Sequence, residues 1–539
     1  MVNVNKVTGI LEALEESEDV QVYEPLVGVY REWEKDHPFD EGVGWGNEPW
    51  SQEEMELNEA LVEEAAEKNE YAIVILARTA GEDKDNKMLE GAYCLTSIEE
   101  DMLQKVRKSF AKMIVLLNTG NIMDMSFMDK YRPDAVMYVW QGGMIGGLGT
   151  VDVLTGKVCP SGRLSDTIAA QMSDYPADPY FGGLEQNLYV EDIYVGYRYF
   201  ESAAKSKVLY PFGFGLSYTT FSMEADGFSY AENQVSFVMK VTNTGSVAGK
   251  EVVQVYAKAP LGKLGKPARV LIDFKKTKEL MPGECETLTF AIPTSVFASY
   301  NEVSTAGMPV GWVLEAGEYT IYAGGNVRDA YAVGSFTLDE LQIVEECRNA
   351  LAPTTAFKRM KMTAANEHAE AACVYEIAME EVPLRVVSPE EKRNAELPES
   401  CEITGDRGIK LADVKAGKAT LDEFVAQLTE EELASIVRGE GMGSPKVTAG
   451  TAAAFGGVTK SLLEKGIPCG CCDDGPSGMR LDSGMKAFSL PNGTLLACTF
   501  NTQLNEELYA FTAVEMIKNR VDILLGPGMN IHRHPLNGR

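Results

Sequence analysis

Several features are scarce in this 539-residue sequence, and each scarcity excludes a class of protein. Basic residues are few: 49 Lys and Arg face 80 Asp and Glu, which gives a formal net charge of −31. A field of this sign repels phosphate backbones and anionic lipid, so we expect no nucleic-acid partner and no membrane role. Long apolar runs are also missing, because Ala72–Ala77 and Met113–Leu117 are far too short to span a bilayer.

Targeting and metal-binding patterns are equally scarce. Met1–Lys6 contains no basic stretch followed by an apolar run, so no signal peptide is visible, and we predict a cytoplasmic protein whose ten cysteines are reduced. Only four histidines occur, and neither His532 with His534 nor the three cysteines between positions 469 and 472 has the spaced pairs of a structural zinc site. The sequence also lacks a glycine-rich phosphate loop, so it predicts no metal and no cofactor.

What is present indicates several domains. An apolar fraction of 45% in a chain of this length supplies cores for about three or four of them. In residues 1–220, continuous apolar runs at Ala72–Ala77, Met113–Leu117 and Ala135–Trp140 alternate with polar helical stretches. This pattern is typical of parallel strands that are buried on both faces and joined by crossover helices. In such open α/β sheets, ligands bind at the carboxyl ends of the strands.

From residue 221 the apolar period switches to two, which indicates an all-β domain over 221–340. Apolar residues alternate in Val235–Val241, Thr287–Ile292 and Glu318–Ala323, with turns between these runs. Short alternating strands at this spacing predict a β-sandwich of about 120 residues. Residues 341–419 are acidic, proline-containing and weakly patterned, so we expect a helical and extended linker that packs on neighbouring domains.

The last segment, 420–539, has the signals of an opening (β/α)8 barrel. Thr420–Glu423 and Thr429–Glu432 are capping boxes, which predict two helix starts. A strand ahead of Asp474, a helix near Gln503–Asn519 and the strand Val521–Leu525 then follow one another. The order strand, loop, helix, strand, loop fits the first half of such a barrel.

Several stretches in a compatible order match one family. They are Pro160–Thr167, Tyr194–Phe200, Tyr210–Thr219, Asn243–Tyr256, Cys472–Arg480 and Leu524–Arg539. Through them the chain resembles the family 3 glycoside hydrolases, chiefly β-glucosidases, in the subgroup whose barrel comes last. The resemblance implies a multidomain fold: an α/β sandwich, a fibronectin type III-like β-sandwich, then the first half of the barrel. It also implies a retaining, exo-acting enzyme that removes terminal β-linked glucose from short oligosaccharides or aryl glucosides.

The resemblance implies a proton donor as well. Retaining glycosidases need two carboxyl groups about 5–5.5 Å apart, one as nucleophile and one as acid/base. Glu82 lies just past Ala72–Ala77, and the surrounding segment is similar to the family's acid/base loop, so Glu82 is the candidate catalytic residue. Most loop glutamates are only solvated, however, and Asp83 and Asp85 are close enough to confuse the assignment.

The substrate-binding candidates follow from the same resemblance. Asp474 matches the aspartate that accepts hydrogen bonds from adjacent sugar hydroxyls, although an Asp-Gly-Pro sequence is otherwise an ordinary turn. Arg480 and Arg539 match two arginines that would donate to ring hydroxyls or orient carboxylates. Trp50, in a polar segment, is our candidate for a contact with the leaving group, whereas tryptophan is more often a core residue.

The family's nucleophilic aspartate and its lysine–histidine sugar clamp follow the position of Arg539, and a complete barrel takes about 250 residues. We therefore expect that activity needs more polypeptide, from a longer gene product or from a second chain that completes the barrel; a homodimer is also possible. Two alternatives stay open. One is a β-xylosidase or a mixed-specificity exo-glycosidase, and the other is a non-catalytic sugar-binding or assembly protein that lacks the nucleophile.

Overall fold

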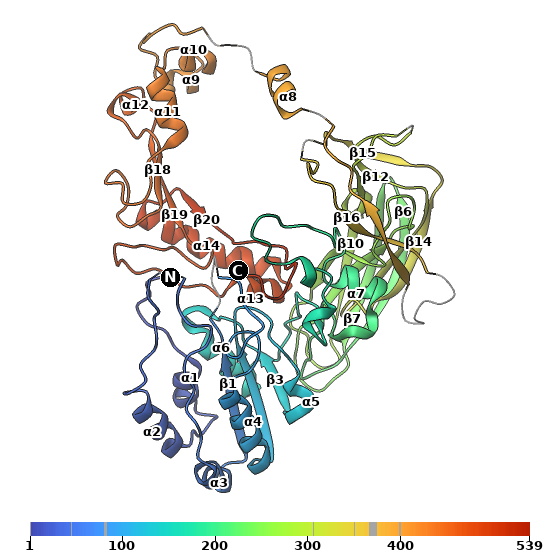
Figure 1. Ribbon diagram of the computed structural model, residues 1–539, viewed down its shortest axis with the longest axis vertical. Coiled ribbons are helices and arrows are strands. Elements are labelled where there is room, and N and C mark those ends of the chain that lie inside the picture. The colour runs from blue at the N-terminus through green and yellow to red at the C-terminus, as the bar shows by residue number, and fades with distance from the viewer. Residues whose placement is uncertain are drawn as a thin grey trace.

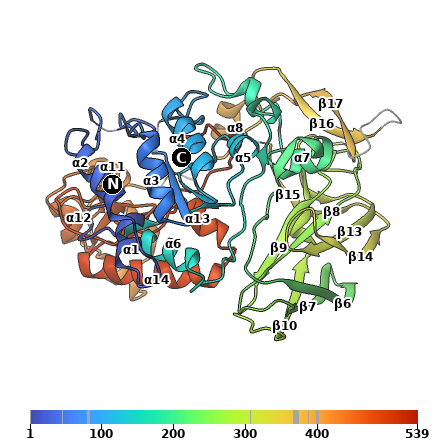
Figure 2. The same cartoon turned by 90° about the horizontal axis from the view of Figure 1, so that it is seen from below.

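The computed structural model describes residues 2–44, 46–79, 84–305, 307–349, 351–365, 374–386, 388–397, 400 and 402–538. Two predicted site residues, Glu82 and Arg539, lie outside these ranges. The described residues form an α/β unit, a β-sandwich and a C-terminal unit that lies against the α/β unit (Figure 1). Seen from below, the sandwich stands beside the other two units (Figure 2).

The α/β unit is built on the three predicted parallel strands. They are β1 (Tyr71–Ala77), β2 (Lys112–Asn118) and β3 (Ala135–Tyr138), in the sheet order β1-β2-β3. Leu76, Val115 and Leu117 are buried in its core, as continuous apolar runs require. The helices of this unit are α1 (Ile10–Glu16), α2 (Glu24–Trp33), α3 (Glu59–Lys68), α4 (Ser97–Ser109), α5 (Phe127–Tyr131), α6 (Gly146–Leu154) and α7 (Tyr197–Ala203). A two-stranded sheet, β4 (Ile168–Ala169) with β5 (Val208–Tyr210), completes it.

A buried ion pair joins the end of β1 to the start of α4. Thr96 and Glu99 form a capping box that begins the helix. Arg78, the residue after β1, donates from Nη1 and Nη2 to the two carboxyl oxygens of Glu99, both at 2.7 Å. Its Nε also donates to the Ala92 carbonyl at 2.8 Å. These bonds fix the chain where it enters the loop that carries Glu82.

The β-sandwich has the predicted period of two. Its strands are β6 (Phe221–Ala231), β7 (Gln234–Asn243), β8 (Val252–Lys258), β9 (Val270–Lys276), β10 (Cys285–Pro293), β11 (Ser299–Asn301), β12 (Gly311–Leu314), β13 (Gly317–Gly324), β14 (Tyr331–Leu338) and β15 (Gln342–Glu346). They pair as β10-β7-β6, β14-β13-β8-β9 and β11-β12-β15. The alternating residues Val235, Phe237, Phe290 and Ile321 are all buried in one core. The α/β unit followed by this sandwich confirms the fold class.

Residues 341–419 contain more regular structure than a linker requires. β15 extends the sandwich by pairing with β12. The hairpin of β16 (Lys358–Ala364) and β17 (Tyr375–Glu381) packs on the α/β unit, where the Met362 N–H donates to the Tyr194 hydroxyl at 3.0 Å. The helices α8 (Pro389–Ala395) and α9 (Leu411–Lys415) follow. The domain boundaries at residues 220, 340 and 419 stay proposals.

The C-terminal unit contains a single β-α-β connection. β19 (Cys469–Asp474) and β20 (Ile523–Leu525) are parallel, with α13 (Gly493–Cys498) and α14 (Thr502–Asn519) between them in the chain. Both predicted capping boxes are present, and they begin α10 (Leu421–Ala426) and α11 (Glu430–Arg438). The first strand, β18 (Ala453–Gly456), is antiparallel to β19 and precedes α12 (Lys460–Glu464). Three strands do not make a barrel, so the half barrel stays a prediction.

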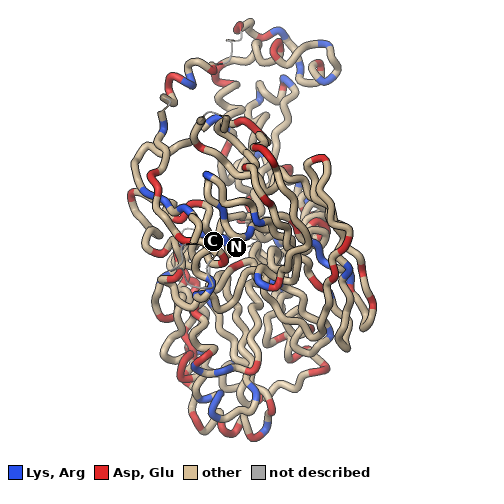
Figure 3. The backbone as a smooth tube through the Cα atoms, turned by 90° about the vertical axis from the view of Figure 1, so that its right-hand side faces the viewer, with Lys and Arg blue, Asp and Glu red and all other residues tan. Residues whose placement is uncertain are grey.

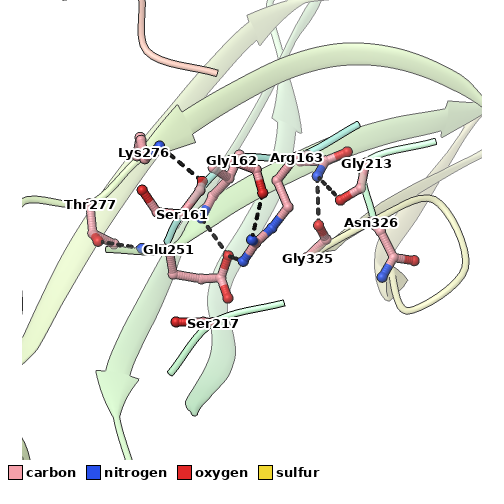
Figure 4. Close-up of polar contacts among 12 residues, drawn as sticks. Ser161, Gly162, Arg163, Gly213, Ser217, Glu251, Lys276, Thr277, Gly325 and Asn326 are labelled. Atoms are coloured by element: carbon pink, nitrogen blue, oxygen red, sulfur yellow. Dashed lines mark hydrogen bonds and ion pairs between the residues drawn. The ribbon is translucent and has the colours of Figure 1, made fainter. Parts of the chain in front are cut away.

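A buried polar junction ties the three units together, and its residues from the α/β unit and the sandwich are shown in Figure 4. Arg163 of the α/β unit donates from Nη2 to Glu251 of the sandwich at 2.5 Å, and its backbone N–H donates to the Cys498 carbonyl of the C-terminal unit at 2.8 Å. Lys276 of the sandwich donates to the carbonyls of Ser161 at 3.0 Å and Thr499 at 2.8 Å. Burial, and next the nearby Arg163 charge, lower the pKa of Lys276 to about 8.

Lys, Arg, Asp and Glu residues occur in all three units. Acidic and basic residues are interspersed along the backbone (Figure 3). In the part of the chain that the structure describes, no helix is long and apolar enough to cross a membrane. The eight described cysteines are free thiols.

The junction yields a test of stability. Glu251→Gln keeps the shape of the side chain but leaves the buried Arg163 guanidinium without its carboxylate. We expect the free energy of unfolding to fall by about 3–5 kcal/mol, because an uncompensated charge stays buried. Urea denaturation followed by fluorescence measures this. Glu381→Gln is the control, since its pair with Lys358 is exposed and should contribute less than about 1 kcal/mol. Equal losses in the two variants would contradict the role of the junction.

Candidate functional site

The carboxyl edge of the parallel sheet meets the C-terminal unit. Beyond β1, the Asn86 N–H donates to the Leu536 carbonyl at 2.8 Å. Beyond β2, the Asn121 side chain donates to the Asn537 carbonyl. Beyond β3, the Gln141 carbonyl accepts from the N–H of residue 492 at 2.9 Å. All three strands therefore end against residues 492–538, at the edge where open α/β sheets bind ligands.

The first of these contacts involves a described flank of the loop that carries Glu82, the predicted proton donor. Glu82 is not described, but both flanks of its loop are. The Gly538 N–H donates to the Asp85 carboxylate at 3.1 Å. Gly538 directly precedes Arg539, and Asp85 follows Glu82 closely in the sequence. The two candidates are more than 450 positions apart in the sequence, so this approach depends on the tertiary fold.

Trp50 lies at the same loop. The Thr79 N–H donates to the Trp50 carbonyl at 2.7 Å, which places the Trp50 backbone next to the start of the loop that carries Glu82. The amino groups of Lys84 and Lys87 lie 4.7 and 5.4 Å from the centroid of its ring. The ring thus takes part in cation–π contacts with two lysines, and a sugar that stacked on it would compete with them.

Asp474 and Arg480 form a second group at the end of β19. The Arg480 N–H donates to the Asp474 carbonyl at 2.8 Å, and the two side chains approach to 3.9 Å. Arg480 Nε also donates to Asp482 at 2.9 Å. The Asp474 side chain is 45% exposed, so its carboxylate is available to a ligand while a guanidinium stands beside it.

Its neighbour Asp473 is placed differently. The side chain is fully buried on the side of β19 that carries Cys471, and neither oxygen has a hydrogen-bond partner of normal geometry within the described residues. Burial raises the pKa of Asp473 to about 6, although the nearby N–H groups of Asp474 and Arg480 act in the opposite direction. Of the two adjacent aspartates, Asp474 is therefore the one that a sugar can reach.

A cavity of about 630 Å³ lies at the same edge of the sheet. Its lining includes Asn121, Trp140, Asp166, His532 and Asn537. Trp140 is only 2% exposed and stacks on Tyr138 with centroids 4.6 Å apart. Its main contribution is to the core.

The sequence alone did not single out the contacts of the C-terminal segment with the α/β unit. In the sequence, His532 and His534 suggested at most a pair of metal ligands. In the structure the His532 ring contacts the Asp166 carboxylate, and the His534 ring contacts the Asp178 carboxylate. Within the described residues, no group of three or more His, Cys, Asp or Glu side chains could hold a metal ion. Asn121 lies just beyond the carboxyl end of β2. Because ligands bind at the carboxyl ends of parallel strands, its position in the sequence could have identified it as a candidate site residue.

Comparisons with known proteins agree with this architecture. Residues 2–218 match the glycosyl hydrolase family 3 C-terminal domain, and residues 251–327 match the fibronectin type III-like domain. A β-glucosidase of Ruminococcus albus is 54% identical over the whole chain, which spans 56% of that relative. β-Glucosidase A of Butyrivibrio fibrisolvens is 35% identical, and the chain spans 70% of it. The chain belongs to glycoside hydrolase family 3.

Solved structures give the same result. A β-glucosidase from Paenibacillus barengoltzii superimposes with a TM-score of 0.96 at 50% identity, over all of this chain and 59% of that one. β-Glucosidase 3B from Thermotoga neapolitana, solved with glucose, superimposes with a TM-score of 0.56 at 34% identity, over 63% of this chain and 47% of that one. This chain therefore spans little more than half the length of the R. albus and P. barengoltzii proteins.

The buried carboxyl of Asp473 makes stability depend on pH. Its folded pKa of about 6 lies above an unfolded value of about 4, so the folded state binds the proton more tightly. The stabilisation is complete below about pH 4 and is lost as pH rises through about 6. Asp473→Asn should remove this dependence and raise the free energy of unfolding at pH 7 by on the order of 2–3 kcal/mol. Denaturant titrations between pH 4 and 7 measure it, with Asp474→Asn as the half-exposed control. A wild-type slope in Asp473→Asn would refute the assignment.

Proposed function

We propose that this chain supplies the proton donor and part of the sugar-binding site of a retaining, exo-acting β-glucosidase. The observation that carries the proposal is the contact between the loop around Glu82 and the segment before Arg539, through Asp85 with Gly538 and Asn86 with Leu536. The similarity to family members whose names describe β-glucosidases supports the choice of reaction.

In this proposal the α/β unit and the C-terminal unit contribute opposite sides of one site. Asp474 accepts hydrogen bonds from two adjacent hydroxyls of the terminal glucose, and Arg480 and Arg539 donate to the ring or orient carboxylates. Glu82 protonates the glycosidic oxygen as the bond breaks and afterwards activates water. Trp50, next to the loop of Glu82, lies on the side of the leaving group.

We further propose that additional polypeptide completes the barrel and brings the nucleophilic aspartate. β20 pairs with β19 on one side only, among the strands that the structure describes. Large apolar side chains are exposed on the same unit: Phe511, Ile517, Met529 and Ile531 are 67%, 76%, 83% and 75% exposed. An unpaired edge and an apolar surface of this kind favour association with a further segment or chain.

Two finer points belong to the same proposal. The substrate is a neutral glycoside rather than a nucleic acid or a lipid surface, which fits the net charge of −31. The protein works in the cytoplasm, which the free thiols of the eight described cysteines support.

The role of Glu82 can be tested through the leaving group. Glu82→Gln, in the chain together with the polypeptide that completes its barrel, should lower kcat on oligosaccharides by about 10²–10⁴-fold, because a poor leaving group needs a proton. Dinitrophenyl glucoside should lose far less, since its leaving group departs unprotonated. Steady-state kinetics on both substrates measure the difference. Asp83→Asn and Asp85→Asn are matched controls, and the same leaving-group dependence in either would transfer the role to that residue.

The need for a completed barrel predicts the behaviour of the isolated chain. Alone it should show no turnover of an aryl β-glucoside, and its exposed apolar residues should drive self-association visible by light scattering. A fluorosugar that traps a glycosyl-enzyme should label no residue of this chain. Rapid turnover by the isolated monomer would sink this part of the proposal. Faster hydrolysis of aryl β-xylosides than of β-glucosides in the completed enzyme would instead replace the proposed sugar.

A further inference from the structure

Three consecutive side chains of the C-terminal unit each bind a carboxylate of the α/β unit. The pairs are His532 with Asp166, Arg533 with Glu191, and His534 with Asp178. The three acids come from separate segments of the α/β unit, so the contacts hold one short stretch from three sides. We call these six residues the clasp.

Arg533 is the buried centre of the clasp. Its Nε and Nη2 bind the two carboxyl oxygens of Glu191, whose side chain is fully buried. Nη2 also donates to the Leu188 carbonyl at 2.7 Å, and the guanidinium carbon lies 4.3 Å from the centroid of the Tyr189 ring. A planar guanidinium suits this combination of a two-pronged bond and a stacked ring, and a lysine does not.

His534 is held as a neutral ring with one defined tautomer. Burial lowers the pKa of His534. The Leu536 N–H donates to Nδ1 at 3.2 Å, so the ring proton is on Nε2, which donates to Asp178 at 3.1 Å. The ring also stacks on Phe181 with centroids 4.3 Å apart. The bond to Leu536 couples the clasp to the residue whose carbonyl contacts Asn86.

His532 is the outer contact and the one that responds to pH. Its Nδ1 lies 2.9 Å from the Asp166 carboxylate, and that carboxylate raises the pKa of His532. The other titratable groups that line the same cavity are Tyr175, Tyr189, Asp192, Tyr197, Arg198 and His534. Since the folded pKa is raised, the ion pair is complete in acid and weakens as pH rises through that pKa.

We propose that the clasp is a positioning device that sets the sugar-binding side of the site against the loop of the proton donor. The segment that directly follows the clasp, Leu536–Gly538, is the one that contacts Asp85 and Asn86. The clasp residues themselves do not react. They act by holding Leu536–Gly538 against Asp85 and Asn86, and this inference rests on the proposed function.

The first test needs no catalysis. Asp166→Asn removes the outer ion pair and Arg533→Lys removes the two-pronged bond. Hydrogen–deuterium exchange of peptides that contain Asn86 and Gly538 should rise by about tenfold in each variant, because these amides then open locally. Peptides of the β1–β2 ladder should not change. His37→Gln is the matched control, since His37 also faces a carboxylate, Glu53, but outside the clasp.

The second test uses the completed enzyme. Asp166→Asn should lower kcat by about 10–100-fold with little change in KM, because a small misplacement of reacting groups costs rate more than binding. The wild-type rate should also carry a component that falls as pH rises through the raised pKa of His532, in addition to the alkaline fall from deprotonation of Glu82. This component should be absent in Asp166→Asn, which a merely structural role would not produce.

The outcomes separate the two ideas. Unchanged exchange in both variants overturns the clasp as a positioning device. Faster exchange with unchanged kcat and pH profile shows that the clasp orders the segment without serving the reaction, which also overturns the proposal. If the variants exchange faster but the completed wild-type enzyme has no glycosidase activity, the proposed function is wrong. The clasp would still order the segment in that case.

Discussion

The arrangement of this chain depends on the buried pair of Arg163 and Glu251. The pair lies where all three units meet, and the same segment receives a bond from Lys276 and gives one to Cys498. Burial, and after it the nearby Arg163 charge, lower the pKa of Lys276 to about 8. Backbone carbonyls accept the remaining donors. The junction thereby fixes the C-terminal unit against the α/β sheet at one end, which is the precondition for a site built from both.

A second constraint is topological. Parallel strands send all their carboxyl ends to one edge, so three loops far apart in sequence reach the same surface. Arg78 and Glu99 fix one of these loops at its start, and Asn121 fixes the next through Asn537. A carboxyl group in the first loop can then form a site together with any unit that packs on that edge. These contacts do not depend on the order of the units along the chain.

The sequence predicts those features that have a local cause. Continuous apolar runs predicted the parallel strands, and a period of two predicted the sandwich. The capping boxes at Thr420 and Thr429 predicted the starts of two helices. It could not predict the antiparallel pairing of β18, because pairing direction has no local signal in four residues. The roles of His532 and His534 were also out of reach, since their acidic partners lie more than 350 positions away. The sequence could not distinguish Asp473 from Asp474, whereas the structure shows that the first is buried and the second is half exposed.

The C-terminal unit is held from one side only. The junction binds it at residues 498–499, and the ion pairs of residues 532–534 bind it at the other end. Between these two attachments lie α14 and β20, whose Phe511, Ile517 and Leu525 are exposed. Polypeptide that packs on this outer face would not displace the contacts at Asp85 and Asn86. In the proposed enzyme, this chain would therefore hold Leu536–Gly538 against Asp85 and Asn86 through its own contacts, and a segment on the outer face would bring the nucleophile without displacing them.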